Sequence, residues 1–401
     1  MFNRISQIEP LFPRENKTLI DLVMQVYREG SELGGLVNPI TRNQISNLLR
    51  HINSYYSNRI EGEHTTPFDI ERAVRQEYST NSEKKRLQQL SVAHIEVQKL
   101  IDERLNSELD VEVCSKNFLC WIHREFYQRV PQSFLKIYDP DKSKTIIMKP
   151  GEIRRQDVKV GNHVAPAFGF LDDFLAHFEQ KYSHHRLAGH TALLAAAASH
   201  HRLVWIHPFL DGNGRVSRLF TYAYLRKANL ESYGLWTLSR GLATNDEYYR
   251  NMLAHADKTR MNDVDGRCNI SEKALTEFCT YFFEVALDQI KFMNSMLRLD
   301  ILRDRIIGYV TLRSQELIPD EKELRIEAKY VLSEIMIRGE IARGEVQHLI
   351  GLGERTATKL ISTLLQEELV VSESHRSPLR FNIPFKVVGY YFPNLYPVGS
   401  V

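Results

Sequence analysis

One stretch of the chain constrains its fold more than any other. From Leu187 to Trp205 the residues are apolar nearly all round, with an alanine-rich centre. A segment that is hydrophobic on every face forms a helix that is buried on most of its sides. Apolar residues at helical spacing in the ranges 45–56 and 216–223 predict further, amphipathic helices. The expected fold class is therefore mainly α.

The composition is that of a globular protein. The 401 residues exceed one ordinary domain, and 25% of them are charged. The net charge of +2 is too small to argue for a nucleic acid or an anionic membrane as a partner. The N-terminus lacks the apolar core of a secretory signal, and no apolar run approaches the roughly 20 residues that span a bilayer. These features predict a cytoplasmic protein that does not contact a membrane.

Neither cysteines nor paired histidines predict a metal site. The four cysteines, at 114, 120, 268 and 279, are too scattered for a disulfide scaffold or a zinc site. Histidine pairs occur at 184–185 and 200–201. Adjacent side chains on a helix point in different directions, so we expect these histidines to have structural roles.

Two interruptions of the helical pattern suggest how the chain is organised. The range 153–160 alternates charged and β-branched residues between Gly151 and Gly161, which predicts a strand or hairpin. The turn-forming residues 138–143 are expected to lead into it. We place boundaries near residues 105 and 300. They delimit an N-terminal helical segment (1–105), a core (106–299) and a C-terminal domain (300–401).

The C-terminal residues predict a winged helix-turn-helix. A helical stretch (343–350) meets Gly351 and Gly353, a second helix follows (354–368), and two short β-rich pieces come next. In the second helix, four side chains could meet a major groove: Arg355, Thr356, Thr358 and Lys359. However, residues 341–401 carry six Lys or Arg against five acidic residues, so a protein-docking or regulatory role is favoured over DNA binding. The aromatic tail 390–396 is expected to pack back on a domain.

The segment 207–218 carries the residues best suited to bind an anion. Gly212, Asn213 and Gly214 open an amphipathic helix, and small residues there let backbone N–H groups approach an anion closely. The helix N-terminus adds unsatisfied donors and a favourable dipole. Arg215 and Arg218 are three residues apart, so both project over the same anion.

Two further side chains of this segment complete a set for phosphoryl or nucleotidyl transfer. Asp211 is a hard oxygen ligand beside the anion site, where Mg²⁺ is expected. His207 is the group in the segment that can take a proton near neutral pH without help. A base, a metal ligand, an anion nest and two arginines are the parts that such a transfer needs.

The string from His207 to Arg215 resembles the signature of the Fic family, His-Pro-Phe-x-Asp/Glu-Gly-Asn-Gly/Lys-Arg, and fills every fixed position. Residues 197–200 resemble the helix that precedes this motif in the family, and residues 238–249 resemble its segment near the adenine. The resemblance covers roughly residues 45–260. It implies a helical core with a small β-hairpin flap. It also implies a protein adenylyltransferase, which moves AMP from ATP onto a hydroxyl side chain of a protein with the help of Mg²⁺.

The resemblance also implies a role for each residue. His207 resembles the general base that deprotonates the target hydroxyl, and Asp211 resembles the Mg²⁺ ligand. Phe209 is expected to anchor the loop. The nucleotide-binding set that the resemblance implies is Gly212, Asn213 and Gly214 as the anion hole, Arg215 and Arg218 on the phosphates (Arg218 on the γ-phosphate), and Tyr248 and Tyr249 near the adenine.

A second, shorter pattern lies before the core. The segment from Ser57 to Gly62 matches the inhibitory pattern of the family, Ser/Thr-x-x-x-Glu-Gly/Asn. Gly62 suits the position that ends a helix, and a carboxylate at a helix C-terminus is disfavoured by the dipole, so Glu61 needs a cationic partner. The resemblance implies that this partner is Arg218. Such a pair would occupy the arginine that the γ-phosphate needs.

Partners and alternatives follow from the same resemblance. Residues 153–168 resemble the flap that holds the target, and Arg154, Arg155 and the range 158–160 would form an edge that pairs with an extended peptide. Self-modification and assembly into a homo-oligomer stay open. Two other functions also stay open. One is removal of AMP, or another transfer, by an enzyme of the same fold. The other is DNA-binding regulation by a protein whose core only senses nucleotide.

Overall fold

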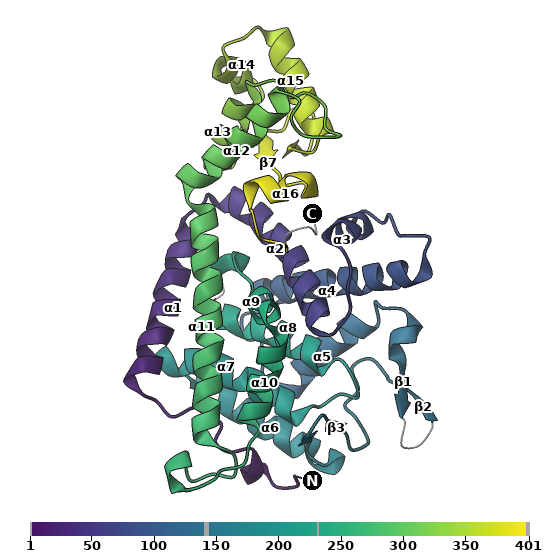
Figure 1. Ribbon diagram of the computed structural model, residues 1–401, viewed down its shortest axis with the longest axis vertical. Coiled ribbons are helices and arrows are strands. Elements are labelled where there is room, and N and C mark those ends of the chain that lie inside the picture. The colour runs from purple at the N-terminus through teal and green to yellow at the C-terminus, as the bar shows by residue number, and fades with distance from the viewer. Residues whose placement is uncertain (1, 140–143, 231, 398–401) are drawn as a thin grey trace.

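The computed structural model describes residues 2–139, 144–230 and 232–397, and it is mainly α-helical, as predicted (Figure 1). The larger part contains the helices α1 (Lys17–Gly35), α2 (Pro39–Ile60), α3 (Pro67–Val74), α4 (Ser82–Ser107), α5 (Lys116–Tyr127), α6 (Leu171–Tyr182), α7 (Gly189–Ile206), α8 (Asn213–Lys227), α9 (Leu238–Thr244), α10 (Asp246–Ala256) and α11 (Glu272–Leu297). The smaller part contains α12 (Leu299–Ser314), α13 (Ala328–Arg338), α14 (Glu345–Ile350), α15 (Glu354–Gln366) and α16 (Phe385–Tyr391). Among the described residues, no helix combines the length and the apolar character needed to cross a membrane.

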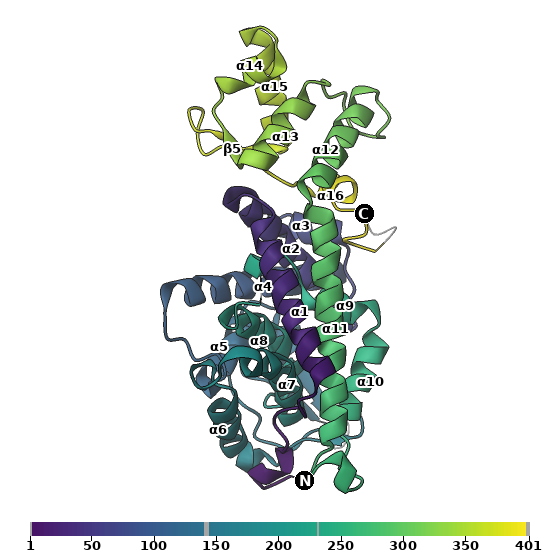
Figure 2. The ribbon, with the colours of Figure 1, turned by 90° about the vertical axis from the view of Figure 1, so that its left-hand side faces the viewer.

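Helix α7 occupies the centre of the larger part, as its apolar sequence predicted. Nearly every residue from Leu193 to Ile206 is buried. Helices α6 and α8 pack on it, and α1 and α11 run side by side along the body next to it (Figure 2). The four alanines 195–198 are completely buried, which allows these neighbours a close approach.

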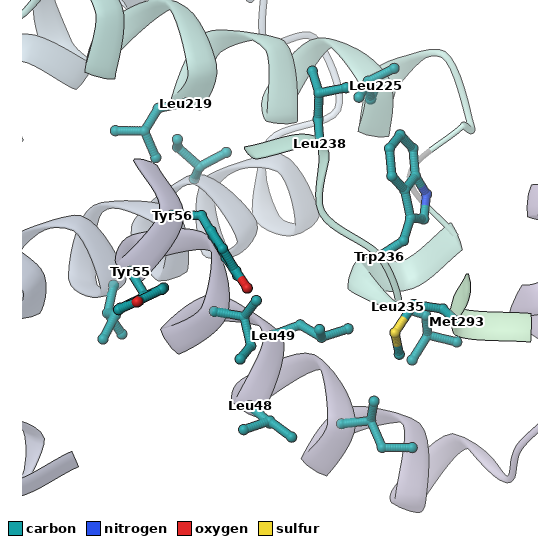
Figure 3. Packing of buried hydrophobic residues seen from close by; sticks show 14 of the residues in the cluster. Leu48, Leu49, Tyr55, Tyr56, Leu219, Leu225, Leu235, Trp236, Leu238 and Met293 are labelled. Carbon is teal, nitrogen blue, oxygen red and sulfur yellow. The ribbon is translucent and has the colours of Figure 1, made fainter. Parts of the chain in front are cut away.

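Helix α2 packs its apolar face onto this body and ends where the sequence predicted. Pro39 stands at its first turn, where the missing N–H costs nothing, and Gly62, just after the C-cap residue Glu61, has a φ of +80°. Figure 3 shows Leu49 and Tyr56 of α2 gathered with Trp236 and with leucines of α8 and α9. The apolar face of α2 is thereby held against α8 and α9.

The flap differs from the prediction. In the range 153–160, only Lys159–Val160 forms a strand, β3, which pairs with β4 (His163–Val164). A longer hairpin lies earlier in the chain and was not predicted: β1 (Lys136–Asp139) pairs with β2 (Lys144–Ile147). The sequence placed only a turn at 138–143, and residues 140–143 of that turn lie outside the described residues.

The smaller part begins after Arg298, where α11 ends and α12 starts. It continues through α13, the strand β5 (Glu340–Ile341), the helices α14 and α15, and the strands β6 (Val370–Val371) and β7 (Leu379–Phe381), with the sheet order β5-β7-β6. The two helices and the two strands that follow them lie where the sequence predicted. Their assignment as a winged helix-turn-helix stays a prediction, as do the domain boundaries.

The C-terminal tail packs back on the larger part, as predicted. The rings of Tyr396 and Tyr55 stand edge to face, with centroids 5.4 Å apart. The carbonyl of Leu395 accepts hydrogen bonds from the hydroxyl of Tyr56 and from Nε of Arg240. Helix α2, which carries Tyr55 and Tyr56, is therefore held by both parts of the chain.

Candidate active site

His207 stands at the point where α7 ends. It has a left-handed backbone (φ 51°, ψ 61°), and Pro208 follows it. A residue before proline is driven out of the right-handed helical region, which ends the helix and turns the chain into the loop 208–212. The loop leads directly into α8, so one sharp turn places the imidazole beside the start of the next helix.

The imidazole of His207 is set up to accept a proton. Its Nδ1 lies 3.3 Å from the carbonyl oxygen of Val204. A carbonyl can only accept, so Nδ1 carries the hydrogen and Nε2 keeps its lone pair. Burial lowers the pKa of His207 to about 4, although the bond to Val204 acts in the opposite direction. The side chain is therefore neutral at pH 7.

The loop after His207 is held rigid by its own side chains. The ring of Phe209 is fully buried and stacks on His123, with centroids 4.1 Å apart. The side chain of Asn213 accepts from the N–H of Phe209 at 2.9 Å and donates to its carbonyl at 2.8 Å. Phe209 thus anchors the loop, and the side chain of Asn213 closes it, which leaves only the backbone of Asn213 for an anion.

Gly212, at the end of the loop, and Gly214, in the first turn of α8, lie where a larger residue would collide with other side chains. Gly212 has a φ of +79°, and a Cβ there would collide with the ring of Tyr127. A Cβ on Gly214 would collide with the carboxylate of Glu61. The motif therefore fits closely against two other segments of the chain, one in α5 and one at the end of α2.

Arg215 and Arg218, in the first two turns of α8, both point at the end of α2. Nε of Arg215 donates to Oδ1 of Asn58 at 3.2 Å. Arg218 donates through Nε to Oγ of Ser57 at 2.9 Å, and through Nη2 to Oε1 of Glu61 at 2.7 Å. The Glu61–Arg218 pair that the resemblance implied is thus present, and Ser57 is a second partner of Arg218 that was not predicted.

The Glu61–Arg218 pair is shielded from water. The side chain of Arg218 is only 2% exposed and that of Glu61 is 27% exposed. Burial alone would raise the pKa of Glu61, but the charges of Arg218 and Arg215 lower it below the usual value. Glu61 is therefore ionised at neutral pH and forms an ion pair with Arg218.

Asp211 lies at the open edge of the loop. It is exposed, and its Oδ1 accepts from the N–H of Gly212 at 2.6 Å. An exposed carboxylate beside a helix N-terminus is a hard oxygen donor of the kind that Mg²⁺ prefers. Asp211 could therefore supply an oxygen ligand to a magnesium ion.

Comparison with known proteins agrees with this geometry. Residues 113–225, which include the whole loop and most of α8, match the model of the Fic/DOC family. The chain therefore contains a Fic domain. The chain is 44% identical over 78 residues to the protein adenylyltransferase Fic of Aedes aegypti, and 47% identical over 79 residues to that of Drosophila yakuba. Each match covers 20% of this chain but only 16% of the relative.

Solved structures show that this Fic protein shares its fold with others. A Fic family protein from Desulfovibrio desulfuricans G20 matches 92% of the chain over 98% of its own length, with a TM-score of 0.55 and 15% identity. Residues 134–508 of Fic-1 from C. elegans match 69% of the chain over 72% of their length, with a TM-score of 0.50 and 15% identity. At this identity the likeness concerns the fold alone.

The two tyrosines that the sequence placed near the adenine have different surroundings in this Fic protein. Tyr248 is 49% exposed, whereas Tyr249 is 2% exposed. The hydroxyl of Tyr249 lies 2.7 Å from Nε2 of His200, whose Nδ1 lies 2.7 Å from the hydroxyl of Thr221 on α8. Tyr249 is thus a core residue behind α8, and only Tyr248 faces an open surface. His200 has a structural role, as predicted.

The flap of this Fic protein contains one residue whose place differs from the prediction. Arg154 was expected at a surface edge, but it is 2% exposed. Its Nε donates to the carbonyl of His207 at 2.8 Å, and its other nitrogens donate to the carbonyls of Gln156 and Pro166. Its own N–H donates to the carbonyl of Pro208. Arg154 therefore fastens the flap to His207 and the loop that follows it, while Arg155 remains exposed.

These contacts make Arg154 a stability prediction. Arg154→Lys is expected to lower the free energy of unfolding by about 1–3 kcal/mol, because an ammonium cannot serve all three carbonyls and at least one is left unpaired in the interior. Urea unfolding measures the change. The same substitution at the exposed neighbour, Arg155→Lys, should stay within about 0.5 kcal/mol of wild type. Equal effects at the two positions would contradict the anchoring role.

Proposed function

We propose that this Fic protein transfers AMP from ATP onto a hydroxyl side chain of a protein, and that Glu61 restrains the reaction. One observation carries the proposal. A neutral His207, with a free lone pair on Nε2, stands beside a helix N-terminus and two buried arginines. A base next to a polyanion site is the arrangement that attack of a hydroxyl on a nucleotide requires.

The start of α8 would hold the phosphates. The N–H groups of Asn213, Gly214 and Arg215 lie in its first turn, where a helix has no carbonyl to receive them. Arg215 and Arg218 would add their guanidinium groups to the same phosphates. Asp211 would hold the Mg²⁺, which supplies positive charge against the charge that develops on the leaving pyrophosphate.

His207 would act once the target hydroxyl lies near its Nε2. The imidazole takes the proton of the hydroxyl, the oxygen attacks the α-phosphorus, and pyrophosphate leaves. The flap would present the target, and Arg154 keeps it at a fixed distance from His207. The exposed flap residues Arg155, Lys159 and Val160 would remain for the edge of an extended peptide.

Glu61 would restrain the reaction because it occupies Arg218. The γ-phosphate of ATP carries charge that Arg218 would otherwise receive, and the Glu61 carboxylate stands where that contact forms. Glu61 would have a different role if the enzyme removed AMP, which is the alternative left open above. An ionised Glu61 beside the loop could then orient the water molecule that attacks.

The proposed function is tested by mass spectrometry of the intact chain after incubation with ATP and Mg²⁺. A covalent gain of one 5′-AMP group on the chain or on an added protein supports the transfer. An AMP-modified protein that loses its AMP in the same mixture would support removal instead. If the protein neither gains nor loses AMP while the Glu61→Gly variant binds ATP, the chain is not an AMP transferase and only senses nucleotide.

The rate of AMP transfer is expected to depend on pH through the protonation of His207. Its pKa of about 4 keeps the imidazole unprotonated, and therefore active as a base, throughout the neutral range. In the Glu61→Gly variant, kcat/KM should be flat from about pH 6 to 8 and should fall only as the pH approaches about 4. Removal of Glu61 lowers the pKa further, because its charge raises it. Circular dichroism confirms folding at each pH, and a half-maximal rate near pH 6.5 would refute the assignment.

We also infer that the smaller part is a winged helix that docks a protein or regulates the core. The element order of α13, β5, α14, α15, β6 and β7 supports this inference. Arg355, Thr358 and Lys359 are exposed on α15, and Thr356 is half-buried. The near balance of charge in residues 341–401 still favours a protein partner over DNA.

A further inference from the structure

A cluster of potential metal ligands lies away from the nucleotide site. Glu112 precedes α5, and His184 and His185 lie in a short 3₁₀ helix (His184–Arg186) between α6 and α7. One ligand atom from each of the three side chains lies within 4.8 Å of the others. We propose that Glu112, His184 and His185 bind a divalent transition-metal ion, and that Zn²⁺ is the ion this ligand set favours.

The prediction that adjacent histidines diverge was wrong at this pair. The ring centroids of His184 and His185 are only 3.8 Å apart. The prediction assumed an α-helix, but this segment is a three-residue 3₁₀ helix whose side chains need not follow α-helical directions. The two rings therefore lie close enough to share one ion.

Glu112 is held in place as a metal-binding carboxylate should be. Its Oε1 accepts from the N–H of Cys114 at 2.9 Å, and its Oε2 accepts from the hydroxyl of Ser183. Two hydrogen bonds therefore fix the orientation of the carboxylate.

Nδ1 of His184 lacks a hydrogen-bond partner among the described residues. This nitrogen is buried and lies 3.9 Å from Oε1 of Glu112. A buried ring nitrogen without a partner is costly, and a metal ion would satisfy it. Ligand atoms of a tetrahedral zinc site are about 3.4 Å apart at bonds of about 2.0–2.1 Å. Rotation of the exposed His185 ring can bring the third ligand in.

The ion would link two segments that are already in contact. Sγ of Cys114 donates to the carbonyl of Tyr182 at 3.3 Å, so the segment before α5 runs against the end of α6. Zinc would tie this segment to the turn that leads into α7. Its expected consequence is a higher melting temperature that depends on the Zn²⁺ concentration. The site is separate from the proposed AMP chemistry.

The test is a Zn²⁺ titration of the full chain, stripped of metal, against a chromophoric chelator and in excess Mg²⁺ that occupies Asp211. Wild type is expected to bind one Zn²⁺. Ser183→Ala should weaken binding about 10- to 100-fold through loss of the bond to Glu112, and Glu112→Gln and His185→Gln should weaken it more. His375→Gln, an exposed histidine outside the cluster, should bind like wild type.

Each result decides the proposal. A visible absorption band of bound Co²⁺ typical of tetrahedral geometry, lost in His185→Gln but kept in His375→Gln, would support it. His185 is exposed, so its replacement should leave the fold intact, and circular dichroism verifies that. The proposal is overturned if wild type loses all Zn²⁺ to the chelator, or if Glu112→Gln and His185→Gln bind Zn²⁺ as tightly as wild type.

Discussion

Glu61→Gly is expected to raise the rate of AMP transfer by about 10- to 100-fold. The variant breaks a charge-assisted hydrogen bond of 2.7 Å to Arg218 in a largely buried setting. Such bonds contribute about 1.5–3 kcal/mol, and each 1.4 kcal/mol corresponds to a factor of ten. The freed guanidinium keeps its bonds to Ser57 and so stays in position for a γ-phosphate.

The matched control for this variant lies two residues further on. Glu63→Gly removes a carboxylate that pairs with Arg86 rather than with the loop. It should leave the rate of AMP incorporation, measured by mass spectrometry at saturating ATP, at the wild-type level. Equal rates for wild type and Glu61→Gly would show that the pair does not restrain the enzyme.

His207→Ala, made in the Glu61→Gly background, is expected to lower kcat by about 10²- to 10⁴-fold. A positioned general base contributes an acceleration of that size. The phosphates would contact α8, so the dissociation constant for ATP should change little. Pyrophosphate release measures the rate, and calorimetry measures the affinity for ATP.

The control for this variant must remove a histidine without touching the loop. His375→Ala in the same background meets that condition, because His375 is exposed in the C-terminal part. Its rate should equal that of the background. If His207→Ala retained the background rate, a different group would have to be the base.

The helices and the central loop could be predicted from the sequence because their signals are local. Burial of α7 follows from its own apolar residues, and Gly62 ends α2 by its own φ of +80°. The Glu61–Arg218 contact spans 157 residues. It could be predicted only because both positions matched family motifs, since no spacing rule connects them.

Other parts of the site could not be predicted because they depend on contacts between distant segments. Arg154 lies in a stretch that alternates charged and β-branched residues, and this pattern predicts an exposed strand edge. Arg154 is buried because the carbonyls of His207, Gln156 and Pro166 converge on it. Tyr248 and Tyr249 are neighbours in the sequence, yet only the tertiary packing of α10 decides that Tyr249 meets His200. The approach of Glu112 to His184 is equally nonlocal.

The transfer of AMP with His207 as the base is tested most directly by following a radioactive phosphate from ATP into protein. The Glu61→Gly variant is incubated with Mg²⁺ and with ATP labelled at the α-phosphate or, separately, at the γ-phosphate. Only the α-label is expected to enter protein, and this incorporation should be lost when His207 is also replaced by alanine. Incorporation of the γ-label, or α-label incorporation that survives without His207, would contradict this mechanism.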